Sequence, residues 1–232
     1  MNNFSEKIID YKQYIVDSKL RYFKPHATKI EKSFAEEISY SLNQNSKFIN
    51  PKFFYDRKGS DLFESITSLP EYYPTRTEIS ILKKLKQDLP SYLDENMNLV
   101  ELGSGASVKT RLILDIFTKL QVKTEYFPID ISEILTESSE QLLKDYDTLH
   151  ITGIIDTYEG GLEFLKTYDN KKNLILFLGS SFGNFTPDDG KLFLEKIFST
   201  MNSDDLFLIG LDLVKDKNIL ESAYDDSQGV TA

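Results

Sequence analysis

From Asn98 onward the chain alternates between short apolar runs and stretches with helical periodicity. The runs are Leu99–Leu102, Glu125–Ile129, His150–Ile155, Leu174–Leu178 and Leu206–Leu211. Such short runs are typical of strands buried on both faces, and parallel strands need a crossover between them, usually a helix. The alternation therefore predicts an α/β fold in which right-handed βαβ units build a parallel sheet of five strands.

The segments between the runs carry helix signals. Val108–Leu120 has apolar residues at helical spacing, and Ser132 can cap a helix over Glu133–Tyr146. Thr186 and Pro187 are favourable residues for the first two positions of a further helix. Ligands of parallel sheets bind beyond the carboxyl ends of the strands. The residues expected at that edge are Gly103–Ser107, Asp130, Asp156–Tyr158, Gly179–Phe185 and Asp212.

The composition narrows the function classes. The 232 residues include 37 acidic and 27 basic ones, a net charge of -10, which argues against nucleic acid or an anionic membrane as the main partner. The absence of cysteine excludes disulfides and thiolate sites and fits a reducing cytosol. We see no membrane span, signal peptide, metal-ligand spacing or Ser-His-Asp arrangement, so we expect a cytoplasmic protein without a metal.

The chain before Asn98 reads as a separate unit. We expect residues 1–97 to be a mainly helical, substrate-binding extension and residues 98–232 to be the cofactor-binding core. Within the extension, Gly59–Ser60 can start a short helix at Asp61, and Thr75 with Glu78 forms a capping-box pattern for the next helix.

The stretch "LVELGSGASVKT" follows the first predicted strand. Gly103 and Gly105 match the start of the dinucleotide fingerprint G-x-G-x-x-G, but Val108 replaces its third glycine, and the P-loop signature is absent. Asp130 ends the second strand, where a carboxylate can accept hydrogen bonds from both ribose hydroxyls of a nucleoside. Together these residues predict a cofactor that contains adenosine. NAD and S-adenosylmethionine both fit, and the missing third glycine favours the latter.

The fourth strand is followed by "LGSSFGNF", which groups Ser180, Ser181 and Asn184 with two glycines. So many small residues indicate a backbone that packs closely against a ligand, with the Asn184 amide able to donate and accept hydrogen bonds. A second interpretation, in which Asn184 simply caps a turn, is equally consistent with this stretch.

Five blocks together resemble the histidine-specific N-alpha-methyltransferases of ergothioneine biosynthesis. They are Tyr55–Glu78, Glu101–Asp115, Phe127–Asp130, Leu178–Phe185 and Leu211–Ala232. The resemblance implies a Rossmann-like class I methyltransferase core, S-adenosylmethionine as the cofactor, S-adenosylhomocysteine as its product, and L-histidine as the substrate. The wider family also methylates other amino-acid substrates, including a prenylated tryptophan.

The resemblance also implies roles for individual residues. The cofactor contacts fall on Gly103, Lys109 and Asp130, and a third-strand acid–aromatic pair falls on Thr157–Tyr158, where Asp156 can supply the acid one position earlier. The contacts to the amino acid fall on Tyr72, Asn184 and Tyr224, and Tyr55 matches a further active-site tyrosine. In this interpretation Asn184 and Tyr55 orient the attacking nitrogen.

One departure from the family pattern concerns the C-terminus. Family members continue past "GVTA" into a segment that recognises the imidazole ring, and the five predicted strands lack the closing antiparallel hairpin of such sheets. We therefore expect the final strands of the sheet to be missing, weak binding of free histidine, and self-association through the open edge of the sheet. The alternatives are the same chemistry on another amino acid, a catalytically inactive cofactor-binding protein and, more distantly, an NAD-dependent oxidoreductase.

Overall fold

The computed structural model describes residues 11–26, 33–50, 53, 56–105, 107–132 and 134–231. Seven strands form one sheet: β1 (Tyr11–Ile15), β2 (Leu20–Pro25), β3 (Met97–Leu102), β4 (Thr124–Asp130), β5 (Leu149–Ile155), β6 (Lys172–Phe177) and β7 (Leu206–Ile209). Their order across the sheet is β1-β2-β5-β4-β3-β6-β7. All neighbours are parallel except the β1–β2 hairpin. The predicted parallel α/β sheet is confirmed, and each of the five predicted strands is present.

From β3 onward the described α-helices alternate with the strands, and three further α-helices come before β3. The α-helices are α1 (Phe34–Leu42), α2 (Arg57–Thr67), α3 (Tyr73–Leu85), α4 (Val108–Leu120), α5 (Ile134–Asp145), α6 (Tyr158–Tyr168), α7 (Pro187–Thr200) and α8 (Lys217–Ala223). Two short 3-10 helices, η2 (Leu89–Tyr92) and η3 (Ser181–Asn184), complete the described part. None of the described helices combines the length and apolar character needed to cross a membrane.

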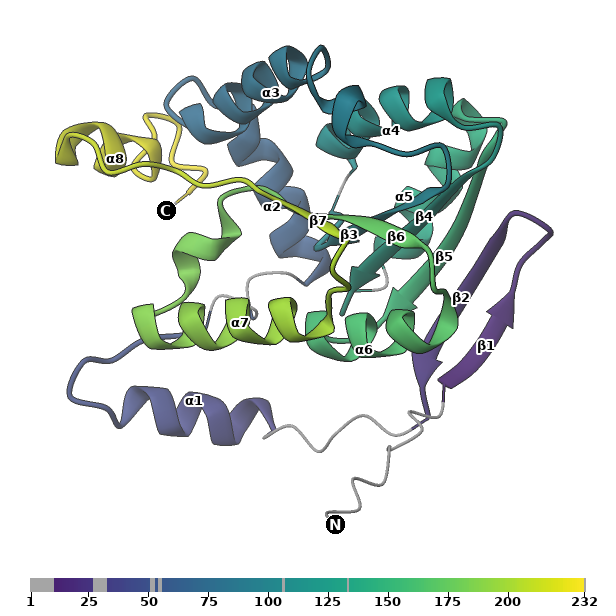
Figure 1. Cartoon of the computed structure of the whole chain (residues 1–232). Coiled ribbons are helices and arrows are strands. Elements are labelled where there is room, and N and C mark those ends of the chain that lie inside the picture. The colour runs from purple at the N-terminus through teal and green to yellow at the C-terminus, as the bar shows by residue number, and fades with distance from the viewer. Residues whose placement is uncertain are drawn as a thin grey trace.

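Two apolar layers hold the helices on opposite faces of the sheet (Figure 1). Leu99 and Leu174 pack with side chains of α3, α4 and α5, whereas Val100 and Ile175 pack with side chains of α6 and α7. Successive residues of a strand point to opposite faces, so β3 and β6 need apolar residues at every central position. This double burial is why these strands read as continuous apolar runs in the sequence.

The N-terminal residues contribute strands as well as helices. The sequence predicted a mainly helical extension over residues 1–97, but β1 and β2 form a hairpin whose second strand pairs in parallel with β5, with Leu20 opposite Ile151. The parallel sheet is thus extended by residues that lie far from its other strands in sequence. The boundary at residue 97 does not separate two independent cores.

Two predicted helix starts are wrong. Helix α2 begins at Arg57, because the Asp56 side chain accepts a hydrogen bond from the backbone N–H of Gly59 and caps the helix there. Helix α3 begins at Tyr73, so Thr75 is not its N-cap. The Glu78 carboxylate accepts instead from the backbone N–H of Gly179, at 2.9 Å and 3.1 Å.

Candidate functional site

The topology places a ligand-binding edge at the middle of the sheet. Strands β3 and β6 are neighbours, and the helices that follow them, α4 and α7, pack on opposite faces. Loops that leave two adjacent parallel strands in opposite directions open a crevice between them, and open α/β sheets bind ligands there. We therefore expect the ligand crevice between the glycine loop after β3 and the Gly/Ser loop after β6.

The glycine loop has a backbone that few side chains tolerate. Gly103 has φ +75°, Gly105 has φ +46° and Ser107 has φ +59°. A Cβ atom on Gly103 would lie 2.8 Å from the hydroxyl of Tyr158, whereas one on Gly105 would have no atom within 4 Å. Gly103 is therefore required by its conformation and by close packing, while Gly105 borders open space.

Two buried hydroxyl groups of this loop lack a hydrogen-bond partner among the described residues. They belong to Ser104 and Ser107. Buried polar groups are normally paired, so an unpaired pair beside an open glycine indicates a polar occupant. The loop therefore fits the polar end of a cofactor.

Asp130 lies next to this loop, as the sequence predicted. It ends β4 and its carboxylate accepts from the backbone N–H of Ser132 at 2.9 Å. Burial raises the pKa of Asp130 above its ordinary value, while hydrogen bonds from the backbone of Ser132 and Gly105 lower it. Ribose hydroxyls that donate to this carboxylate would favour its ionised form.

The third strand end brings Asp156, Thr157 and Tyr158 to the same edge. The Thr157 hydroxyl accepts from the backbone N–H of Gly160 and caps α6. The Asp156 carboxylate accepts from the backbone N–H of Thr157 at 2.7 Å and from the hydroxyl of Tyr11. Tyr11 starts β1, 145 residues away in sequence, and nothing in the sequence indicated its contact with Asp156.

Lys109 lies in the first turn of α4 and forms an ion pair with Glu78 of α3. The Lys109 Nζ atom is 2.8 Å from a carboxylate oxygen of Glu78, and the side chains are 24% and 15% exposed. Lys109 was predicted as a cofactor contact, but Glu78 was missed. Its only sequence signal was a capping pattern that the fold does not use.

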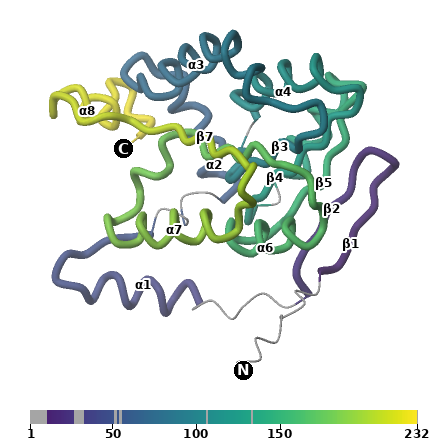
Figure 2. Tube along the Cα trace, in the orientation of Figure 1, coloured from purple at the N-terminus to yellow at the C-terminus, as the bar shows by residue number. Residues whose placement is uncertain are grey.

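The predicted substrate residues fall into two places. Tyr72 is buried before α3, and its ring is perpendicular to that of Tyr224, with centroids 5.6 Å apart. The contact places α8 beside α3, as Figures 1 and 2 show. Asn184 is exposed at the end of η3, in the loop after β6. Tyr55 lies outside the described residues.

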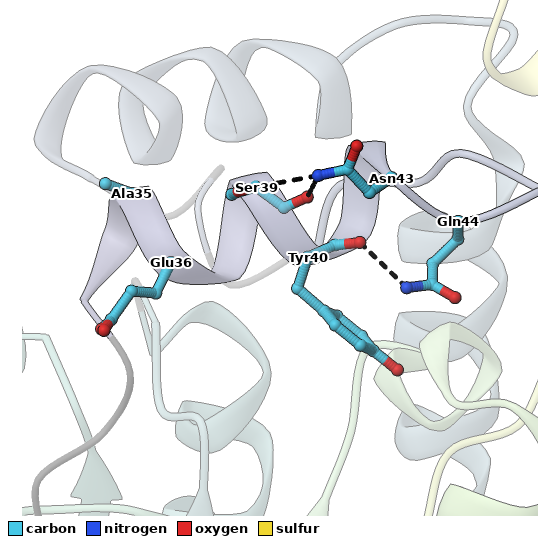
Figure 3. A pocket seen from close by; sticks show the side chains of 6 residues that line it. All are labelled: Ala35, Glu36, Ser39, Tyr40, Asn43 and Gln44. Atoms are coloured by element: carbon cyan, nitrogen blue, oxygen red, sulfur yellow. Dashed lines mark hydrogen bonds between the residues drawn. The ribbon is translucent and has the colours of Figure 1, made fainter.

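Two hollows lie on the described surface, and neither of them is lined by the glycine loop. One is formed by α1 and the residues after it, Ala35, Glu36, Ser39, Tyr40, Asn43 and Gln44 (Figure 3). The other separates α3 from α8 and is lined by Glu71, Tyr73, Arg76, Asn218, Ile219 and Ser222. The second hollow borders the Tyr72–Tyr224 pair, so it lies on the predicted substrate side. The first is built from one helix and its C-terminal turn and brings no predicted site residue together.

Glu101, the acid before the glycine loop, gives the protein a pH-dependent stability. It is 3% exposed, and burial raises its pKa from 4.5 to about 7, although hydrogen bonds from Tyr126 and Thr110 lower it. A carboxyl group with a raised pKa binds its proton more tightly in the folded state, so its contribution to stability is full below pH 4.5 and is lost as pH rises to 7. We expect the free energy of unfolding to fall by on the order of 3 kcal/mol over this window.

Glu101→Gln should remove this slope, because the amide cannot ionise, and the exposed Glu95→Gln should keep it. Urea unfolding between pH 4.5 and 7.5 measures both variants. An unchanged slope in Glu101→Gln would mean that another group titrates.

Comparison with known proteins shows the family of the chain. Residues 34–232 match the family model described as histidine-specific methyltransferase, SAM-dependent, where SAM is S-adenosylmethionine. The histidine N-alpha-methyltransferase of Mycolicibacterium smegmatis is 37% identical over 89% of this chain and 64% of its own length. That of Mycobacterium tuberculosis is 38% identical over 84% and 60%. The chain thus spans less than two thirds of the length of these relatives.

More distant proteins share the fold. A 4-dimethylallyltryptophan N-methyltransferase of Claviceps purpurea is 26% identical over 87% of this chain and 61% of its own length. A solved putative methyltransferase from Thermobifida fusca superposes with a TM-score of 0.51 at 11% identity, covering 82% of this chain and 70% of that chain. The family match covers the glycine loop, Asp130, the Gly/Ser loop and the tyrosine pair. This chain therefore belongs to the family of SAM-dependent, histidine-specific methyltransferases.

Proposed function

We propose that the protein transfers a methyl group from S-adenosylmethionine to the α-amino group of L-histidine, ultimately giving N,N,N-trimethylhistidine. The observation that carries the proposal is the contact of α3 with the cofactor edge. Helix α3 begins beside Tyr72 on the predicted substrate side, and its Glu78 bonds to Gly179 and Lys109 at the crevice. In this proposal, such a helix would bring the amino acid and the cofactor to one edge of the sheet.

The residues of the site fit the cofactor. Gly103, Gly105, the two serine hydroxyls and Asp130 would hold it, and when bound it supplies an electrophilic methyl group on a sulfonium sulfur. Asn184 and Tyr55 would orient the amine of the substrate, and Tyr72 with Tyr224 would hold its carboxylate. Alignment of amine and methyl within about 3–3.5 Å supplies most of the acceleration, because the methyl group is already reactive. Removal of the amine from water favours its neutral, nucleophilic form.

In this proposal, residues 1–97 help to bind the substrate. Within residues 1–97, Tyr72 precedes α3, and the hairpin β1–β2 contributes Tyr11 to the third strand end. Residues 98–232 contribute the glycine loop and Asp130 for the cofactor. The lack of cysteine supports work in a reducing compartment such as the cytoplasm.

A mixed amino-acid pool tests the substrate. The protein is incubated with S-adenosylmethionine that carries an isotopically labelled methyl group, and the products are identified by mass spectrometry. Labelled histidine supports the proposal, and a labelled tryptophan derivative supports the alternative that the Claviceps purpurea relative favours. If titration shows that the cofactor binds but no amino acid in the pool becomes labelled, the protein is a catalytically inactive cofactor-binding protein and the proposal is contradicted.

We also predict that the protein self-associates. In the described part of the chain, β7 has a single neighbour, β6, and the exposed apolar residues Leu211, Leu213 and Val214 follow it. Unpaired strand edges and neighbouring apolar surface favour pairing between copies. Sedimentation should give a mass above the 26.7 kDa of one chain, and a Leu213→Lys, Val214→Lys double variant should shift it toward one chain. A wild type that stays monomeric at high concentration would contradict this.

A further inference from the structure

Glu78 occupies the meeting point of three strand ends, although it belongs to an N-terminal helix. Its carboxylate accepts from the backbone N–H of Gly179 after β6 and pairs with Lys109 after β3. A Cβ atom on Gly210, after β7, would lie 2.0 Å from a Glu78 oxygen. The Glu78 side chain therefore contacts the first turn of α4 and lies against the backbone after both β6 and β7.

The Lys109 side chain is more restricted here than it would be in a surface ion pair. Both side chains are mostly buried, and a Cβ atom on Gly179 would lie 3.0 Å from Lys109 Nζ, so the ammonium group lies against the backbone of that loop. Gly179 has φ +85°, a conformation that favours glycine. A side chain at position 179 would therefore occupy space beside the Lys109 ammonium group.

Lys109 keeps capacity for a ligand in this arrangement. An ammonium group has three N–H donors, and the Glu78 carboxylate takes one of them. The remaining donors can serve an anionic group in the crevice. Without Glu78, a long flexible side chain would regain its rotamer freedom and would have to be ordered again when the ligand binds.

We propose that Glu78 is a positioning residue that holds Lys109 over the crevice and thereby sets the affinity for the cofactor. The inference rests on the proposed function, since it assigns to Lys109 an anionic group of S-adenosylmethionine. Through the same carboxylate, Glu78 links α3, which begins beside Tyr72, to the loop that carries Asn184. Glu78 acts through Lys109 and touches no reacting atom.

A double-mutant cycle tests whether Glu78 acts through Lys109. Calorimetric titration with S-adenosylmethionine is applied to the wild type, Glu78→Gln, Lys109→Met and the double variant. The glutamine keeps an oxygen that can accept from Gly179 but loses the charge that orders the lysine. We expect Glu78→Gln to weaken binding about tenfold in the wild-type background and less than about twofold beside Lys109→Met.

A second variant reaches the same contact from another loop. Gly210→Ala places its methyl group where the Glu78 carboxylate lies, so the carboxylate must move. It should weaken binding about as much as Glu78→Gln, and the two changes together should not add. Glu221→Gln serves as the matched control, because its pair with Lys217 is on the surface, with side chains 84% and 61% exposed. It should leave the affinity unchanged.

The outcomes separate this inference from the proposed function. Additive losses in the cycle, or unchanged or tighter binding by Glu78→Gln, would overturn the positioning role and leave the proposed function standing. If Glu78 only fastened α3 to Gly179, Glu78→Ala would lower the melting temperature while Glu78→Gln left the affinity alone. A wild type that does not bind S-adenosylmethionine would overturn both proposals, whereas binding without histidine methylation would overturn the proposed function alone.

Discussion

Asp130→Ala should lower the affinity for S-adenosylmethionine by about 30- to 1,000-fold, or roughly 2–4 kcal/mol. The half-buried carboxylate ends β4 beside the glycine loop, where it can accept from two ribose hydroxyls, and both charge-assisted hydrogen bonds would be lost. Asp130→Asn keeps the size and one acceptor oxygen, so we expect an intermediate loss. Calorimetric titration of the protein measures all three affinities.

The control is Asp145→Ala at the end of α5. Its carboxylate pairs with Arg111 on the surface and is 53% exposed, so its loss should leave cofactor affinity unchanged. Melting curves without ligand check that the Asp130 variants are folded. Wild-type affinity in a folded Asp130→Ala protein would remove Asp130 from the cofactor site.

Asn184→Ala should reduce methyl transfer about 100-fold while the melting temperature stays within a few degrees of the wild type. The side chain is exposed at the end of η3, so the fold loses little packing when it is removed. In the proposed site the Asn184 amide orients the amine, and small misplacements of reacting atoms cost rates of this order. Turnover of labelled cofactor with histidine measures the effect.

Asn202→Ala offers the matched comparison, since Asn202 is also an exposed asparagine, in the loop after α7. We expect wild-type turnover and stability from it. A large loss of stability with retained turnover in Asn184→Ala would favour the turn-capping role that the sequence left open for Asn184.

Local patterns determined the core of the fold. The apolar runs of β3, β4, β5, β6 and β7 mark strands whose two faces must both be apolar, and that requirement is visible residue by residue. The start of α7 was readable because the Thr186 side chain caps its first turn. The glycine loop was recognisable because two glycines follow a predicted strand, and the structure gives both Gly103 and Gly105 a positive φ.

The site was only partly readable from the sequence. Gly103 and Asp130 follow neighbouring strands, so the rule for parallel sheets was enough to bring them together. Tyr72 and Tyr224 were singled out by family resemblance alone, because they are 152 positions apart by their numbers and no periodic pattern links them. The contact between their rings was seen only in the structure. Their perpendicular packing depends on how α8 returns to α3.

Only the tertiary structure decided which distant residues complete the cofactor edge. The first strand of the hairpin β1–β2 is mostly exposed, whereas β2, which pairs with β5, buries Leu20, Tyr22 and Phe23 in the two apolar layers. The apolar residues of such a short segment show that it is buried, but they do not show which strand of the sheet is its neighbour. Glu78 has the same local sequence whether it caps a helix or reaches Gly179 and Lys109. The pattern of apolar residues along the chain shows which residues of each segment are buried. Which distant segments contact one another depends on their packing, and packing acts only once the segments have come together.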